Sequence, residues 1–353
     1  MKIIIPCLIA AMASLEVSAA QPANVDRDPD REWAAVLALA ATSRSSSGSQ
    51  RTPAQAALAR VQSADSARQA ADAARSFIEQ YPNHLNVRDA RKLEALAALQ
   101  GVSAANSQYE AKAAVLARDF RADPRNSLTD RFEVALLAER VAARSRLGGS
   151  PYGNFPAELE VIANRLRVEF GDAAPVFNFY ASIARGADMA TARRIAENLI
   201  RWPAGREAKA EAQSILNRDS LLNKSADWSL TAVDGKTTKP LRTENRVTLI
   251  VIWSPSAAGL VLPALSSAKR YLPSDAQVIY LAYGGTAEQV EMQRRSAVVP
   301  GVFCRSSDGA NAALLQSLHL NQLPFAVVVD RRGTMAGFGP LSAVPALLQA
   351  ANR

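Results

Sequence analysis

Few side chains in this sequence are suited to chemistry: two cysteines, Cys7 and Cys304, and two histidines, His84 and His319. A dithiol redox couple needs two sulfurs, one that attacks a disulfide and one that resolves the mixed disulfide. We expect Cys7 to be removed with a signal segment, which leaves Cys304 as the single thiol. Neither histidine has a cysteine or another histidine near it at metal-ligand spacing. We therefore expect no metal, and no cofactor is indicated.

The first twenty residues are typical of a secretory signal. Lys2 gives the positive start, Ile3–Leu15 the apolar stretch, and 17–20 (VSAA) a small-residue cleavage site. The apolar stretch contains Pro6 and is too short for a membrane span. We expect export to the periplasm or cell envelope, with no stable membrane span after cleavage. An uncleaved N-terminal anchor is the alternative.

The chain is basic, with a formal net charge of +8 over 353 residues. The charges are spread along the sequence, and no nucleic-acid-binding motif accompanies them. Attraction to acidic surfaces accounts for such a balance, and we expect no nucleic-acid partner.

A buried strand is predicted where the chain reads VTLIVIW, Val247–Trp253. A pure apolar run dense in β-branched residues suits a strand that is covered on both faces. Trp253–Ser256 (WSPS) breaks the run, and Ala257–Arg270 predicts a helix with Pro263 as an internal kink.

This order of strand, turn and helix resembles the active-site segment of TlpA/ResA-type thioredoxin-like (redoxin) proteins. In that family a Cys-x-x-Cys pair stands at the helix N-terminus, where the helix dipole lowers the pKa of the attacking thiol. Here no alignment places a sulfur in the turn, so the resemblance implies a degenerate redox loop. Its residues are Trp253, Ser256, Ala257, Ala258, Gly259 and Leu260.

The resemblance continues over the C-terminal third of the chain. Trp228–Lys236 predicts an alternating strand that enters an Asp-Gly turn. Further strands and helices are expected at Ala276–Ala282 (strand), Thr286–Ser296 (helix), Val299–Cys304 (strand), Ala310–Leu320 (helix), Met335–Phe338 (strand) and Ser342–Ala351 (helix).

The segment Gln322–Gly333 (QLPFAVVVDRRG) is similar to the family's cis-proline segment. The resemblance implies a cis Leu323–Pro324 bond, although chemistry alone makes cis a minority even before proline. It also implies that the backbone at Leu323, Pro324 and Phe325 pairs with an extended peptide, which requires no sulfur.

The N-terminal part has helical periodicity. Residues 21–51 predict a polar leader, a short helix at Asp30–Ala41 with Trp33, Val36, Leu37 and Ala40 on one face, and a flexible serine-rich loop. Residues 52–224 contain four similar helical stretches at irregular spacing: Ala73–His84, Ala114–Asn126, Ile162–Pro175 and Ile195–Glu207. They resemble tetratricopeptide-type hairpins, which bury their apolar faces by stacking. A solenoid or bundle is expected, and whether the units are true tetratricopeptide repeats stays open.

Two features of this region have a structural and a catalytic interpretation. Tyr81–His84 (YPNH) is expected to be a turn between helices and not a histidine site. The aromatic side chains are expected to pack in the core and not to line a ligand groove; they are Phe170, Phe177, Phe179 and Tyr180.

The fold class expected is α + α/β: a signal segment (1–20), the leader (21–51), a helical tetratricopeptide-like layer (52–224) and a thioredoxin-like domain (225–353). The first functional hypothesis is an exported, non-catalytic module that binds a protein or an extended peptide. One alternative is a thiol-disulfide oxidoreductase that acts through Cys304 with an external thiol. The other is a scaffold whose helices bind partner proteins. A lone cysteine in a strand usually serves as a small buried hydrophobe, so Cys304 is expected to react poorly.

Overall fold

The computed structural model describes residues 28–44, 53–102, 107–147, 155–235, 245–307, 311–320 and 323–352. The predicted signal segment, most of the polar leader and the serine-rich loop from residue 45 lie outside the described residues. No helix in the described part of the chain is both long enough and apolar enough to cross a membrane.

The described N-terminal part is helical. Its helices are α1 (Pro29–Arg44), α2 (Pro53–Gln80), α3 (Val87–Gln100), α4 (Ser107–Ala122), α5 (Leu128–Arg146), α6 (Phe155–Phe170), α7 (Ala174–Gly186), α8 (Met189–Arg201) and α9 (Arg206–Asp219). Of these helices, α5 and α8 begin at a residue whose side chain caps the helix N-terminus, Ser127 and Asp188. For example, the Asp188 carboxylate accepts a hydrogen bond from the Thr191 backbone N–H at 3.0 Å.

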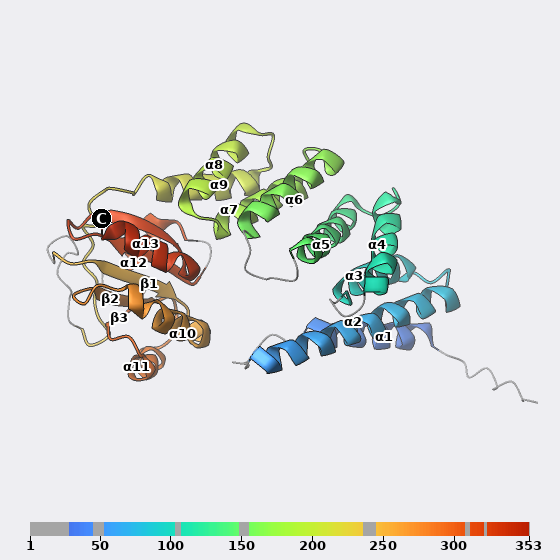
Figure 1. The fold of residues 1–353 in the computed structure, drawn as a ribbon, viewed down its shortest axis with the longest axis horizontal. Helices are drawn as coiled ribbons and strands as arrows, with labels where there is room; N and C mark the ends of the chain where they lie inside the picture. Colours follow the sequence, from blue (N-terminus) through green and yellow to red (C-terminus); the bar gives the residue numbers. More distant parts are fainter. Residues whose placement is uncertain are drawn as a thin grey trace, which may run out of the picture.

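Each of these helices packs against the next, and α3, α5, α7 and α9 also contact one another in that order. The helices follow an arc in Figure 1, with α5 and α7 on its inner side and α4, α6 and α8 on its outer side. Small residues allow this close packing, since alanines such as Ala70, Ala74 and Ala98 are fully buried. The helical layer predicted for this region is confirmed.

Both ambiguous features of the helical layer have structural roles. His84 lies in the turn after α2, its Nε2 lies 3.3 Å from the Asp30 carboxylate, and its ring meets Phe77 edge-on. Phe177 and Tyr180 are 1% exposed, so they belong to the core as predicted. The expected face of α1 is wrong at Leu37, which is 46% exposed. Val36 and Ala40, one turn apart, are buried as expected, and the Trp33 ring packs on Phe77 of α2 with 5.3 Å between ring centres.

The C-terminal part is built on one mixed five-stranded sheet with the strand order β3-β2-β1-β4-β5. The strands are β1 (Thr248–Trp253), β2 (Gln277–Ala282), β3 (Val302–Arg305), β4 (Phe325–Val329) and β5 (Met335–Pro340). β1, β2 and β3 run parallel, whereas β4 and β5 are antiparallel to their neighbours. The helices are α10 (Ala258–Ala268), α11 (Ala287–Ser296), α12 (Asn311–Leu318) and α13 (Val344–Ala351).

The sheet is covered on both faces, as the apolar run of β1 predicted. Leu249 and Val251 pack with α10 and α13 on one face. Ile250 and Ile252 pack with α12 on the other face. Met189, at the start of α8, adds to that second cluster and places the helical layer against it. This is the thioredoxin-like arrangement that the resemblance predicted.

Two boundaries expected for this part are wrong. Trp228–Lys236 does not form a strand within its described residues: Ala232 makes a single bridge to Cys304, and the Asp-Gly turn ends at Gly235 with φ of 80°. The side chains of Trp228 and Leu230 pack into the sheet cluster instead. The last helix of the helical layer ends at Asp219 and not at Lys224. Residues 220–226 turn to pair with the start of β5, where the Asn223 N–H donates to the Met335 carbonyl and the Met335 N–H donates to the Lys224 carbonyl, each at 2.9 Å.

Candidate functional site

Three loops meet at one end of the sheet, where β1 and β2 finish and β4 begins. Ile252 pairs with Phe325, so the antiparallel register sets Trp253 level with Pro324. On the other side, the Tyr283 N–H donates to the Trp253 carbonyl at 2.7 Å. The structure therefore brings the loop after β1 beside the Leu323–Pro324 segment.

The loop after β1 forms a turn of 3-10 helix at Pro255–Ala257 before α10 begins. Trp253 is fully buried, whereas Leu260 in the first turn of α10 is 73% exposed. The only side-chain hydrogen bond between described residues of this loop joins the Ser254 and Ser256 hydroxyls at 2.8 Å. A hydroxyl neither forms disulfides nor ionises near neutral pH, so this loop can offer hydrogen bonds but no redox chemistry.

The Leu323–Pro324 peptide bond is cis, and this prediction is confirmed. β4 is an internal strand, and Phe325 is opposite Ile252 on one side and Pro340 on the other. Phe325 is also only 3% exposed. Leu323 precedes the strand, and its backbone makes no hydrogen bond to another described residue. Of the three residues implied for peptide pairing, Leu323 is the one whose backbone remains available.

Cys304 lies away from this loop. Cys304 is 0% exposed and belongs to the apolar cluster on the face of the sheet that α12 covers. It pairs with Leu281 in β2, so two strand spacings, about 10 Å, separate it from β1. The structure therefore does not bring the Cys304 thiol to the loop after β1.

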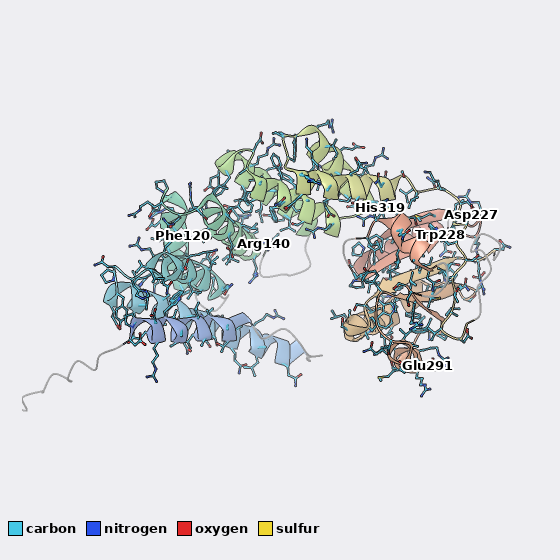
Figure 2. The ribbon with its side chains drawn as sticks, turned by 180° about the vertical axis from the view of Figure 1, so that it is seen from behind. Phe120, Arg140, Asp227, Trp228, Glu291 and His319 are labelled. Atoms are coloured by element: carbon cyan, nitrogen blue, oxygen red, sulfur yellow. The ribbon has the colours of Figure 1, made fainter. Side chains whose placement is uncertain are left out.

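Sequence reasoning missed Arg218, the last basic residue of α9. It is 4% exposed, and its guanidinium carbon lies 5.3 Å from the ring centre of Phe325, the residue after Pro324. Its Nη1 donates to the His319 carbonyl at 3.5 Å. Figure 2 shows His319 where the helical layer meets the sheet domain.

The electrostatics of Arg218 reflect its burial. Loss of hydration lowers the pKa of Arg218, and the nearby Glu211 carboxylate opposes that shift. Burial raises the pKa of Glu211, and Arg185 and Arg218 act in the other direction. Arg185 Nε lies 3.8 Å from the Glu211 carboxylate. Arg185 on α7 and Glu211 and Arg218 on α9 thus form a charged cluster, and Arg218 of this cluster contacts Phe325, the first residue of β4.

Within the described residues, no group of three or more histidine, cysteine, aspartate or glutamate side chains could hold a metal ion. His84 lies against α1, and His319 follows α12 with φ of 46°. Neither makes a described hydrogen bond to Ser254 or Ser256, so these hydroxyls have no histidine base there.

No protein-family model and no curated protein matches the chain. Among solved structures, a secreted disulfide oxidoreductase of Mycobacterium tuberculosis homologous to E. coli DsbE is 13% identical, with a TM-score of 0.28 over 35% of this chain and 96% of its own. A thioredoxin-family thiol:disulfide interchange protein from Chlorobium tepidum is 13% identical, with a TM-score of 0.30 over 36% of this chain and 94% of its own. A thioredoxin-like protein from Aeropyrum pernix is 12% identical, with a TM-score of 0.30 over 41% of this chain and 98% of its own. These likenesses cover 35–41% of this chain.

Proposed function

We propose that the C-terminal domain binds an extended peptide by main-chain pairing at Leu323, without thiol chemistry. The observation that supports this most is the backbone of Leu323, which stands at the end of an internal strand with no described hydrogen-bond partner. An extended peptide supplies matching N–H and C=O groups, as in other cases of strand addition.

The surrounding surface suits peptide side chains. Leu260, in the first turn of α10, is 73% exposed, and Tyr283, directly after β2, is 58% exposed. Successive side chains of an extended peptide point to opposite sides. Apolar side chains on one side of the peptide would therefore find apolar surface here.

A redox function through Cys304 has less support. Thiol-disulfide exchange needs a sulfur that a substrate can reach, and Cys304 is fully buried in the sheet cluster. A one-cysteine enzyme that uses an external thiol would require this cluster to open at every turnover.

We also propose that the protein works outside the cytosol, supported by the signal-like pattern of Lys2, Ile3–Leu15 and residues 17–20. The mass of the protein purified from a periplasmic fraction should correspond to a chain that begins near Ala20 or Gln21. An intact N-terminus found only in cytosolic extract would contradict export.

The peptide site can be tested with phage-displayed random peptides selected on the full chain and then measured by fluorescence anisotropy. Leu323→Pro removes the backbone N–H, whereas the matched control Leu323→Ala keeps it and trims only the side chain. We expect Leu323→Pro to weaken the selected peptides at least about tenfold, because a lost hydrogen bond and the strained backbone both act on binding. The alanine control should change affinity less than about threefold.

Equal affinity for the proline variant and the wild type would overturn the proposal, and so would a failure to select any peptide. Circular dichroism checks that the proline variant is folded. If it is not, amide exchange at Leu323 in the wild-type chain replaces it, with slower exchange expected when the peptide is bound and unchanged exchange counting against the proposal.

A further inference from the structure

The inner side of the helical arc carries two arginines on α5 that differ from most others in the layer. Arg140 is exposed, and its guanidinium carbon lies 5.4 Å from the ring centre of Phe179 on α7. Arg144 is exposed one turn later. Within the described residues neither side chain has a carboxylate partner, and desolvation is what lowers the pKa of Arg140. Figure 2 shows Arg140 facing the open space of the arc.

Arginines elsewhere in the layer are mostly neutralised by acidic neighbours. Bridges between helices join Arg121 to Glu169, Arg146 to Glu158, Arg165 to Glu139, and Arg194 to Glu160. Arg144 lies in the last turn of α5, where the helix dipole alone favours a cation. Arg140 lies more than one turn before that end, so the dipole does not account for its position.

The surface next to Arg140 is polar and uncharged. On α7, Asn178 and Ser182 are exposed on either side of the buried Phe179. The Asn178 amide can donate and accept hydrogen bonds, whereas the Ser182 hydroxyl already donates to the Phe179 carbonyl at 2.7 Å and can only accept. Phe179 holds the guanidinium of Arg140 from one side by a cation–π contact, which leaves its N–H groups directed at other partners. The result is a positive surface with hydrogen-bonding side chains beside it.

We propose that this face, formed by Arg140 and Arg144 of α5 with Asn178 and Ser182 of α7, binds an acidic segment of a partner protein. Charge complementarity selects the acidic partner, since two arginines without described carboxylates match two or more Asp or Glu side chains. A single-stranded nucleic acid fits less well, because base stacking needs exposed aromatic rings and Phe179 is 5% exposed. This surface is separate from Leu323, and the proposal holds whether or not a peptide binds there.

The test uses the full chain and a fluorescein-labelled decaglutamate peptide, with decaglutamine as the neutral probe. We expect decaglutamate to bind and to weaken as salt rises, and decaglutamine not to bind. The variant Arg140→Gln with Arg144→Gln should weaken decaglutamate at least about tenfold, since it removes both positive charges and the charge-assisted hydrogen bonds that they donate. Arg140→Lys should retain part of the affinity because it keeps the charge.

The control is Arg118→Gln with Arg125→Gln. It removes the same two charges from exposed positions whose partners, Asp119 and Asp123, are close in sequence. It should change affinity less than about twofold. Equal losses in both double variants would mean that net charge alone attracts the probe, and this overturns the proposal. A single-stranded oligonucleotide of equal charge that binds more tightly at the same arginines would overturn it as well.

Discussion

Replacing Arg218 by methionine should loosen the junction between the helical layer and the start of β4. Methionine keeps most of the length and apolar stem of arginine but loses its charge and its planar group. The change removes the cation–π contact with Phe325 at 5.3 Å and the hydrogen bond to the His319 carbonyl at 3.5 Å. It also leaves Glu211 with one buried positive neighbour fewer.

The expected loss of stability follows from these contacts. Removing one partner of a buried charged cluster costs about 3–5 kcal/mol in general. The net loss in the free energy of unfolding is smaller than this, because the variant no longer buries the charge of Arg218. Desolvation of that charge is the main cause of the lowered pKa of Arg218. We expect a net loss of about 2–3 kcal/mol at about pH 8. The double variant Arg218→Met with Glu211→Gln should lose only about 1 kcal/mol, since it removes the buried carboxylate charge together with Arg218, and Arg185, at 37% exposure, stays in contact with water.

The pH dependence gives a second, independent check. Without Arg218 the pKa of Glu211, already raised by burial, should rise further. A carboxyl whose folded-state pKa is raised contributes stability below its unfolded pKa and loses it as pH rises through the folded value. The defect of Arg218→Met should therefore be larger at about pH 8 than at about pH 4, where Glu211 is protonated.

Denaturant unfolding, followed separately by far-ultraviolet circular dichroism and tryptophan fluorescence, measures this loss even if the two parts of the chain unfold in separate steps. A loss below about 0.5 kcal/mol, or a defect that does not change with pH, would refute the role assigned to Arg218. Arg193→Met is a matched control, because Arg193 lies on α8 and is 59% exposed. It should change stability by less than about 1 kcal/mol.

Three further predictions concern single positions. Cys304 should react with a thiol reagent only after denaturant is added, and Cys304→Ser should leave affinity for the selected peptides unchanged; fast stoichiometric labelling of the native protein would contradict this. Gly301→Ala should lower the free energy of unfolding by about 2 kcal/mol or more, because the added Cβ would lie 2.5 Å from the Val278 carbonyl. Gly259→Ala has open space around it and should leave the free energy of unfolding unchanged or raise it by about 0.5–1 kcal/mol. A higher unfolding midpoint for Gly301→Ala than for Gly259→Ala would be inconsistent with the packing. Asp188→Ala should cost about 1 kcal/mol through its cap on α8, and this loss should shrink as pH falls through the lowered pKa of Asp188; a loss that stays constant down to about pH 2 would argue against the cap.

The elements of the sheet domain were predicted best where the apolar pattern of the segment and the family resemblance indicate the same structure. The run Val247–Trp253 is apolar except for Thr248, and both of its faces are indeed covered. The cis bond before Pro324 was predicted by resemblance and is present. The strand expected at Trp228–Lys236 is absent from its described residues, because an alternating pattern also arises when a chain without a strand packs side chains such as Leu230 under a sheet.

Sequence alone could not predict the features that depend on how separate parts meet. Arg218 looks like an ordinary cation in the last turn of an amphipathic helix, and only docking of α9 beside Phe325 buries it. Leu37 has the same helical spacing as its buried neighbours, and the direction in which α2 lies decides that it is exposed. The distinct environment of Arg140 likewise becomes visible only when α5 and α7 lie side by side.

The central claim is that Leu323 pairs with an extended peptide and that no sulfur takes part. The most direct measurement is amide hydrogen exchange at Leu323 in the Cys304→Ser protein, with and without a peptide selected on the wild-type chain. The account predicts that saturating peptide slows exchange at Leu323 at least about tenfold, as a new main-chain hydrogen bond does. Binding that leaves exchange at Leu323 unchanged, or that disappears in the Cys304→Ser protein, would contradict it.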